Sequence, residues 1–166
     1  FVSCTFRACD FTGARLGDAL FSDCTFEACN LSGVLLGGCR FHGAVFSGCK
    51  WMGVDFTPIT TMLLDFAFRD CRVELCNFAG LALGRTVFAA YVLREDDFGG
   101  ANLEQADFRG SDLQGSVFDA TNLQKADFRG AVNYAIDPTR NRLRKARFSL
   151  PEAGSLLRTF GVVLDP

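Results

Sequence analysis

The sequence predicts a solenoid, because a large apolar residue recurs at every fifth position for most of its length. The series begins with Phe6, Phe11 and Leu16, breaks once, and then runs from Phe68 to Phe128. A period of five matches neither the roughly 3.6 residues of an α-helical turn nor the roughly two of a strand. A fixed repeat of this length is typical of architectures whose function depends on surface shape and charge.

A second column, made of small residues, supports the same period. Cys, Ala, Val, Ser or Thr stands two positions before most of the large residues, as at Cys4, Cys24, Ala106 and Thr121. Each five-residue unit therefore directs one large and one small side chain inward, and the other three face outward or form a turn. An Asp or Asn immediately before the large residue, as in Asp107-Phe108, favours that turn.

Two consecutive units have the sequences ANLEQ (101–105) and ADFRG (106–110) and resemble the A(D/N)LXX motif of the pentapeptide-repeat family. The resemblance covers roughly residues 1–135. It implies an all-β solenoid, a right-handed quadrilateral β-helix with four of these units in each coil. The five-residue spacing alone sets neither the square cross-section nor the hand.

Length and composition fit one elongated domain. The 166 residues are 49% hydrophobic and 22% charged with a formal net charge of −2, which excludes a disordered acidic tail and a generic polybasic nucleic-acid binder. No apolar run approaches the roughly 18 residues of a membrane span, and we expect no secretory leader. We therefore expect a cytoplasmic protein without a membrane partner. Because Phe1 is already in phase with the repeat, we also expect a segment to precede it.

The eight cysteines all fall in the small inward column: Cys4, Cys9, Cys24, Cys29, Cys39, Cys49, Cys71 and Cys76. Their spacings include no pair separated by two residues, the arrangement that short zinc-binding loops favour. Coils of four units would stack Cys9 on Cys29 at a strand spacing of about 4.8 Å, which a disulfide permits. Parallel side chains and a reducing cytosol oppose the bond. We expect buried thiols that act as small hydrophobic residues.

The repeat slips by two positions between Phe56 and Phe68, which are twelve residues apart. Pro58 and the apolar run Met62–Leu64 lie in this break, at about residues 57–66, and predict a kink or a short loop between two stacks of coils. A tolerated insertion and a functional loop both remain open.

The small column is irregular at Tyr91 and Asp96. An unpaired carboxylate is costly to bury, so the wall either bulges and turns both side chains outward or lets Asp96 bind local amides.

The C-terminal segment, residues 136–166, is predicted to hold a final irregular coil, a short α-helix and a strand. Ser149 to Glu152 has capping-box spacing with Pro151 in the first turn, and Gly161 is a typical helix stop. Val162–Leu164 indicates a short strand. The apolar residues of this segment form either a solenoid cap or a two-fold dimer contact: Leu156, Leu157, Phe160, Val162, Val163 and Leu164.

The stretches 131–137 and 146–157 resemble the C-terminal ends of pentapeptide-repeat proteins of the AlbG and Qnr type and, more loosely, of the MfpA type. That resemblance implies a homodimer formed through the C-terminal helix and strand. It also implies a mimic of duplex DNA that engages DNA gyrase, or its paralogue topoisomerase IV. The implied role is resistance or self-immunity to a topoisomerase poison such as a quinolone or albicidin.

The charge pattern agrees with such a mimic. Residues 1–139 carry 17 acids and 11 bases, whereas residues 140–166 carry six bases and two acids. Folding the second stack with four units in each coil gathers acids on two adjacent sides. One side holds Asp96, Asp97 and Asp119 without a base, and the other holds Glu74, Glu95 and Asp112 against Arg72 and Arg94. We predict that this acidic strip of six residues binds the partner. A third side alternates Arg69 with Asp70, Asp107 with Arg109 and Asp127 with Arg129, which predicts self-neutralising ladders. A charge run is also common on a solvated face without a partner.

Catalysis is not expected. His42 is the single histidine, and the chain has no glycine-rich phosphate loop, nucleophile elbow or metal cluster, so we expect neither cofactor nor metal. The leading hypothesis is the gyrase-directed DNA mimic. The alternative is a pentapeptide-repeat scaffold for protein interactions unrelated to gyrase. A third treats Arg140–Arg147 as a phosphate contact, but the acidic body opposes it, so no direct nucleic-acid binding is expected.

Overall fold

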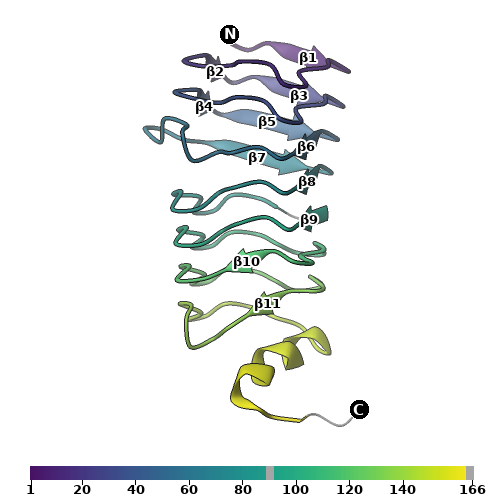
Figure 1. Cartoon of the computed structure of the whole chain (residues 1–166), viewed down its shortest axis with the longest axis vertical. Helices are drawn as coiled ribbons and strands as arrows, with labels where there is room; N and C mark the ends of the chain where they lie inside the picture. Colours follow the sequence, from purple (N-terminus) through teal and green to yellow (C-terminus); the bar gives the residue numbers. More distant parts are fainter. Residues whose placement is uncertain (89–91, 164–166) are drawn as a thin grey trace.

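The computed structural model describes residues 1–88 and 92–163 as a rod of stacked coils (Figure 1). Successive coils pair in parallel, and the usual partner of a residue is the one four units later, as in Thr5↔Thr25 and Thr25↔Val45. Four five-residue units therefore complete each coil. The predicted all-β solenoid is confirmed, with the N-terminus at one end of the rod and a short helix at the other.

Short strands mark the sides of the coils. They are β1 (Thr5–Arg7), β2 (Leu20–Ser22), β3 (Thr25–Glu27), β4 (Arg40–His42), β5 (Ala44–Ser47), β6 (Lys50–Met52), β7 (Phe66–Arg69), β8 (Arg72–Glu74), β9 (Val92–Arg94), β10 (Val117–Phe118) and β11 (Ala135–Ile136). The sheets have the orders β1-β3-β5-β7, β2-β4, β6-β8-β9 and β10-β11. Isolated bridges such as Asn102↔Asn122 continue the ladder elsewhere. The backbone groups of one coil thus find their hydrogen-bond partners in the next.

Phenylalanine rings stack along two opposite sides of the rod. On one side the column is Phe6, Phe26, Phe46, Phe68, Phe88, Phe108, Phe128 and Phe148, with neighbouring centroids 4.7–5.7 Å apart. The facing column contains Phe78 and Phe98, stacked at 5.1 Å. The two columns meet edge to face, as Phe88 and Phe98 do at 80°. Each such contact adds about 0.5–1.5 kcal/mol beyond burial of area.

The break in the repeat is a loop rather than a kink. Across it Ala44 pairs with Phe66 instead of Leu64, the residue four units later, so two residues are inserted. The insertion projects at residues 61–64, where Met62 is 78% and Leu63 73% exposed. Ring stacking continues past it, with Phe46 and Phe68 at 5.6 Å. The two stacks therefore form one continuous solenoid (Figure 1).

Phe66 compensates for a missing core residue beside this loop. Thr61, the residue that would follow Phe41 in its column, is exposed, so that side of the coil lacks a large inward side chain. Phe66 occupies the small position opposite Ala44 and is buried. Its ring contacts Phe41 at 6.1 Å and Phe68 at 5.2 Å.

A second change of register lies near the C-terminus and has no counterpart in the sequence prediction. Val117 pairs with Ala135, two positions short of the usual four-unit offset, whereas Asn122 pairs with Arg142 at the full offset. Tyr134 consequently fills a small-column position and is buried there. The ladder continues to Arg147, so coil pairing extends beyond residue 135.

The prediction that the cysteines are inward-facing core residues is confirmed for six of them, while Cys4 and Cys9 in the first coil are partly exposed. Thiols donate to carbonyl oxygens, as Cys49 Sγ does to Phe26 O at 3.3 Å. In the second half of the chain, hydroxyl groups in the small column donate instead, as Ser116 Oγ does to Leu93 O at 2.8 Å. The side chains of the small column therefore donate hydrogen bonds to backbone carbonyl oxygens, and they are also small enough to fit beside the large core residues.

The C-terminal helix differs in three respects from the prediction. The segment η1 (Glu152–Phe160) is a 3₁₀ helix rather than an α-helix, although it ends at Gly161 (φ 69°) as expected. The prediction of a capping box is wrong, because no side chain of the described residues caps the helix and the Ser149 hydroxyl instead accepts a hydrogen bond of 2.9 Å from the Gly130 amide. Val162 and Val163 form no strand, and Leu164 lies outside the described residues. Within the described ranges, no helix is long and apolar enough to cross a membrane.

Candidate interaction surfaces

The corners of the rod determine where surface charges lie. The last residue of most described units turns the chain onto the next side with a positive φ, as at Glu95 (57°), Gln105 (62°) and Gly115 (75°). Because successive units follow the four sides in order, Glu95 and Gln105 lie at diagonally opposite corners. Residues one coil apart share a corner and are separated by about 4.8 Å.

Asp96 does not belong to the acidic surface, and its assignment to the strip is corrected here. Its side chain is fully buried, because the wall keeps its regular path and the small column points inward at this position. Asp96 Oδ1 accepts a hydrogen bond of 2.8 Å from the Cys76 amide, and Oδ2 has no partner among the described residues. Local amide binding, the second of the two sequence alternatives, is thus observed for Asp96. Tyr91 lies outside the described residues.

Burial also removes the charge of Asp96. Desolvation raises the pKa of this carboxyl to about 8, against a lowering by the Cys76 amide, and nearby Glu74 adds to the rise. The group is therefore protonated for the most part at neutral pH. An uncharged acid inside the core contributes nothing to the surface potential.

Three other members of the strip are neutralised by arginines. Both oxygens of the largely buried Glu74 accept hydrogen bonds from Arg72, at 2.8 and 3.0 Å. Asp112 is paired with Arg94. Asp119 is paired with Arg140 of the following coil at 2.7 Å.

Glu95 and Asp97 remain as the uncompensated pair. Both are exposed, and neither forms an ion pair within the described part of the chain. Glu95 stands at a corner and borders a shallow groove of about 420 Å³ together with Leu75, Arg94 and Gly115. Asp97 accepts a hydrogen bond from the Gly99 amide at 2.8 Å. Only two of the six predicted acids therefore contribute an uncompensated negative charge to the surface of the strip.

The same side of the rod carries further acids that sequence reasoning missed. Bridges align Asp55, Asn77 and Asp97 in successive coils, and Asp137 belongs to the last unit on that side. The two-residue slip hid this column, because a strict four-unit period does not place Asp55 above Asp97. Hydrogen bonds from the Thr139 hydroxyl and amide lower the pKa of Asp137, so it stays ionised.

The predicted self-neutralising ladders are confirmed for two of the three pairs, whereas Arg69 and Asp70 form no ion pair among the described residues. Arg109 binds Asp107 at 2.7 Å, and Arg129 binds Asp127 at 2.6 Å. Exposed pairs of this kind contribute little stability, typically about 0–1 kcal/mol. Their main effect is that these two pairs add no net charge to this side of the rod.

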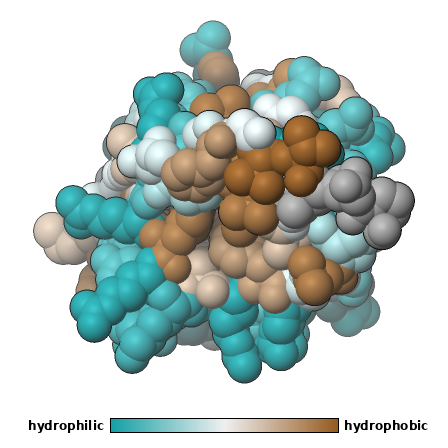
Figure 2. All heavy atoms as spheres, turned by 90° about the horizontal axis from the view of Figure 1, so that it is seen from below, coloured by the Kyte–Doolittle hydropathy of each residue, from teal (hydrophilic) through white to brown (hydrophobic). Residues whose placement is uncertain are grey.

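The C-terminal end presents an apolar surface. Leu156 packs against the core, whereas the other residues of the predicted contact are exposed: Leu157, Phe160, Val162 and Val163. Leu150, 84% exposed, adds to them. Figure 2 looks onto this end and shows apolar residues gathered at its centre with hydrophilic residues around them.

In residues 1–88 and 92–163, no group of three or more His, Cys, Asp or Glu side chains is arranged to hold a metal ion. His42 is exposed on β4.

Several solved structures have a fold similar to that of this chain. A trypsin-treated variant of QnrB1, a plasmid-mediated fluoroquinolone resistance protein, is 22% identical over 98% of this chain and 88% of its own, with a TM-score of 0.59. A second trypsin-treated variant of QnrB1 is also 22% identical, covers 97% and 87%, and has a TM-score of 0.54. HetL of the cyanobacterium Nostoc, involved in heterocyst differentiation regulation, is 16% identical over 89% and 86%, with a TM-score of 0.50.

These likenesses confirm the right-handed quadrilateral β-helix. The comparison with curated protein sequences gives no match. The family model "Pentapeptide repeat region" matches residues 1–78 and 21–98, and "Pentapeptide repeats (8 copies)" matches residues 97–132. The chain therefore belongs to the pentapeptide-repeat family.

Proposed function

We propose that the protein binds DNA gyrase, or its paralogue topoisomerase IV, as a mimic of duplex DNA and counters a topoisomerase poison. The resemblance of its C-terminal segment to the AlbG, Qnr and MfpA group supports this proposal, as does its fold likeness to QnrB1, a fluoroquinolone resistance protein. The observation that most supports this proposal is that Glu95 and Asp97 are exposed carboxylates, without ion-pair partners among the described residues, on the surface of a narrow rod.

The rod has suitable dimensions for the proposed role. The phenylalanine column from Phe6 to Phe148 spans seven coil spacings of about 4.8 Å, which is roughly 34 Å and close to one turn of B-DNA at about 34 Å. Its backbone ladder and ring columns make it stiff, so its acidic groups keep fixed positions, as the phosphates of a duplex do. Asp137 stays ionised because its neighbours favour the charged form.

A dimer would complete the mimic. We propose that the apolar C-terminal surface of Leu157, Phe160, Val162 and Val163 meets its own copy about a two-fold axis. Leu164 belongs to the proposed contact but lies outside the described residues. The paired rods would span about two turns of duplex, with an acidic side on each half.

The test is a DNA supercoiling assay with purified gyrase, with and without a quinolone or albicidin. Wild type should either inhibit supercoiling or preserve it against the poison. The double variant Glu95→Lys/Asp97→Lys should lose the effect. Asp65→Lys/Asp70→Lys is a matched control, because it makes the same charge change at exposed residues away from the strip. No effect of wild type, or equal effects of both variants, would contradict the proposal.

A protein-interaction scaffold unrelated to gyrase is the second candidate. HetL supports it, because a chain of the same fold takes part in regulating heterocyst differentiation. A wild type that leaves gyrase unaffected in every arm of the assay would favour this alternative.

A further inference from the structure

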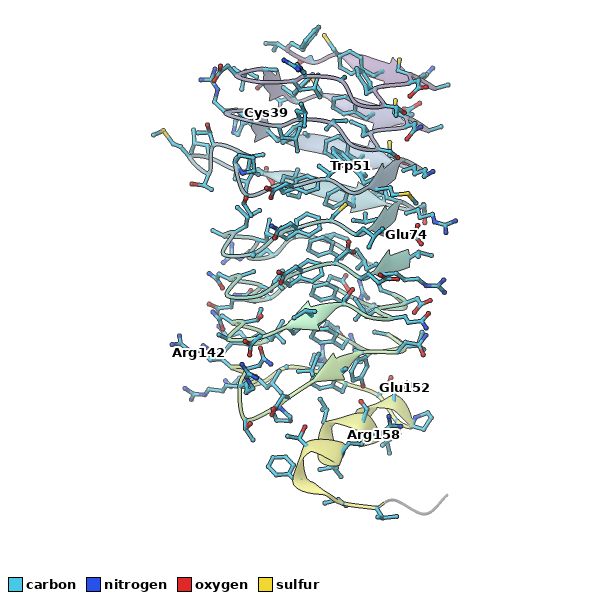
Figure 3. The ribbon with its side chains drawn as sticks, in the orientation of Figure 1. Cys39, Trp51, Glu74, Arg142, Glu152 and Arg158 are labelled. Atoms are coloured by element: carbon cyan, nitrogen blue, oxygen red, sulfur yellow. The ribbon has the colours of Figure 1, made fainter. Side chains whose placement is uncertain are left out.

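A cluster of basic residues occupies one corner of the rod near its C-terminal end. We refer to it as the basic corner, which consists of Lys125, Arg142, Arg144, Lys145 and Arg147. All five are exposed, and they come from two successive coils. Figure 3 shows Arg142 projecting from the side of the rod into solvent.

Most of these bases lack an acidic partner. Arg142, Arg144 and Lys145 form no ion pair with any residue of the described ranges. Lys125 binds Glu104 at 2.7 Å. Arg147 lies 4.0 Å from Asp127, whose closer partner is Arg129 at 2.6 Å. The arginines at 72, 94, 109, 129 and 140, by contrast, all have carboxylate partners.

The backbone aligns part of the cluster along the rod axis. Lys125 (φ 59°) and Lys145 (φ 62°) take the same corner position in successive coils, below Gln105 (φ 62°). Left-handed backbone is disfavoured by about 1–2 kcal/mol for residues other than glycine, and glycine stands at many other corners, as at Gly110 and Gly130. Long polar side chains thus follow one another where the turn geometry would favour glycine.

A groove lies beside these residues. It measures about 420 Å³ and is lined by four bases and two acids, together with Gln105 and Ala106: Arg109, Lys125, Lys145, Arg147, Asp107 and Asp127. Each of the two carboxylates is paired with the arginine two residues after it. Because it runs over more than one coil, it offers several cationic groups to an extended ligand rather than one to a small ion.

The acidic strip does not cancel this charge. Gly115 lies at the same corner as Glu95, one coil further along the rod. Lys125 is two units after Gly115, and two units cover two of the four sides. The basic corner is therefore diagonal to the corner of Glu95 across the apolar core. Figure 3 accordingly shows Glu74 and Arg142 on opposite sides of the rod. Because exposed charges beyond about 8 Å are screened at physiological ionic strength, the acidic body is a weaker objection to anion binding than the sequence implied.

We propose that the basic corner binds the phosphate backbone of duplex DNA without sequence preference. Three of its unpaired or weakly paired bases are arginines, whose planar guanidinium fork suits phosphate oxygens. Among the described residues, no exposed apolar side chain is interspersed with the five, so the surface has no group for insertion into a membrane. The acidic strip and the basic corner would then serve different partners on opposite corners of one rod.

The proposal is tested by fluorescence anisotropy with a labelled 20-base-pair duplex and the intact protein, without gyrase. With about four phosphate contacts, log affinity against log salt should have a slope of roughly −3.6. The variant Arg142→Glu/Arg144→Glu/Lys145→Glu should bind at least about tenfold more weakly at low salt, since each lost phosphate contact reduces the electrostatic term. Circular dichroism should confirm that it is folded.

The matched control is Arg15→Glu/Arg40→Glu/Lys50→Glu, which changes net charge equally at exposed positions of the N-terminal half. It should retain nearly wild-type affinity. Equal loss in both variants would show that net charge alone governs binding and would overturn the proposal, as would absence of saturable binding by wild type. Equally tight binding of polyglutamate would also overturn it, because it would indicate an acidic protein partner. Gyrase takes no part in this assay, so its outcome is independent of the function proposed above.

Discussion

The amide of Cys76 donates a hydrogen bond of 2.8 Å to the carboxylate of Asp96, which lies in the next coil inside the solenoid. Asn141 makes the same kind of contact with the Thr121 amide at 2.9 Å, and its Nδ2 also donates to Phe118 O at 2.9 Å. Asp96 lacks the second contact, since Oδ2 has no partner among the described residues. An amide therefore fits this column better than an acid.

This relationship predicts that Asp96→Asn stabilises the protein at alkaline pH. The folded-state pKa of Asp96 is about 8 against an ordinary 3.8, so between these values the folded chain holds a proton that the unfolded chain releases. The free energy of unfolding of wild type should thus fall as pH rises from about 4 to 8, by up to about 1.4 kcal/mol per pH unit.

Urea denaturation of both proteins across this pH range measures the effect. The two stabilities should converge near pH 4 and diverge towards pH 8, with the variant the more stable by over about 1 kcal/mol. Asp97→Asn, at the exposed neighbour, should leave the pH profile unchanged. Parallel profiles for wild type and Asp96→Asn would contradict the assignment of a buried neutral acid.

Phe66 should be a stability determinant although it occupies a small-column position. Replacement by alanine, the residue found at Ala44 in the paired coil, should cost about 3–5 kcal/mol, because it leaves a cavity among Phe41, Phe56 and Phe68. Met62→Ala at the exposed loop tip should change the free energy of unfolding by less than about 0.5 kcal/mol. Similar small effects of both changes in denaturant titrations would mean that Phe66 does not fill the core.

The buried thiols should be slow to react in the native state. The thiolate is the reactive form, and burial raises the pKa of Cys39 to about 11 and that of Cys76 to about 12. Mass spectrometry after brief alkylation at pH 8 should find label on Cys4 and Cys9, which are partly exposed, and on the other six only after unfolding. Rapid native labelling of Cys39 or Cys76 would refute the inward orientation.

The apolar C-terminal surface predicts a dimer in solution. Light scattering should report twice the mass of the chain, and Leu157→Asp should yield monomers because it introduces a charge into the contact. Leu35→Asp serves as the control, since Leu35 is also an exposed leucine but lies on the body of the rod. A monomeric wild type at micromolar concentration would exclude this contact.

The sequence was sufficient for the parts of the fold that depend on local periodicity. The five-residue spacing identified the inward columns, and the slip between Phe56 and Phe68 located the loop. The spacing could not reveal that the Phe66 ring fills the core position that follows Phe41 in its column. That packing depends on contacts between side chains of different coils. The shortened offset at Val117↔Ala135 was hidden, since a later insertion restores the phase.

The acidic strip was predicted only in part, and the reason is the reach of long side chains. Folding by four units placed Arg72 and Arg94 on the same side as three of the acids, but it could not show which carboxylate each arginine reaches. Arg140 meets Asp119 from the following coil, and Arg72 folds back onto Glu74 within its own strand. Asp96 was assigned to the surface on the cost of burying a charge, whereas the carboxyl is buried and its pKa raised instead.

The most direct test of the central claim is competition between this protein and DNA for gyrase. Binding to gyrase would be measured with increasing unlabelled duplex DNA and at several salt concentrations. Both labelled wild type and labelled Arg142→Glu/Arg144→Glu/Lys145→Glu are used, because the variant lacks the proposed DNA contact and cannot be drawn off gyrase by binding the DNA itself. A DNA mimic should be displaced in a simple competitive manner, and its affinity should weaken with salt because charge pairing across the contact is screened. Glu95→Lys/Asp97→Lys should fail to bind, while Asp65→Lys/Asp70→Lys binds as wild type does. Binding that is indifferent to both DNA and salt, or absent altogether, would contradict the account.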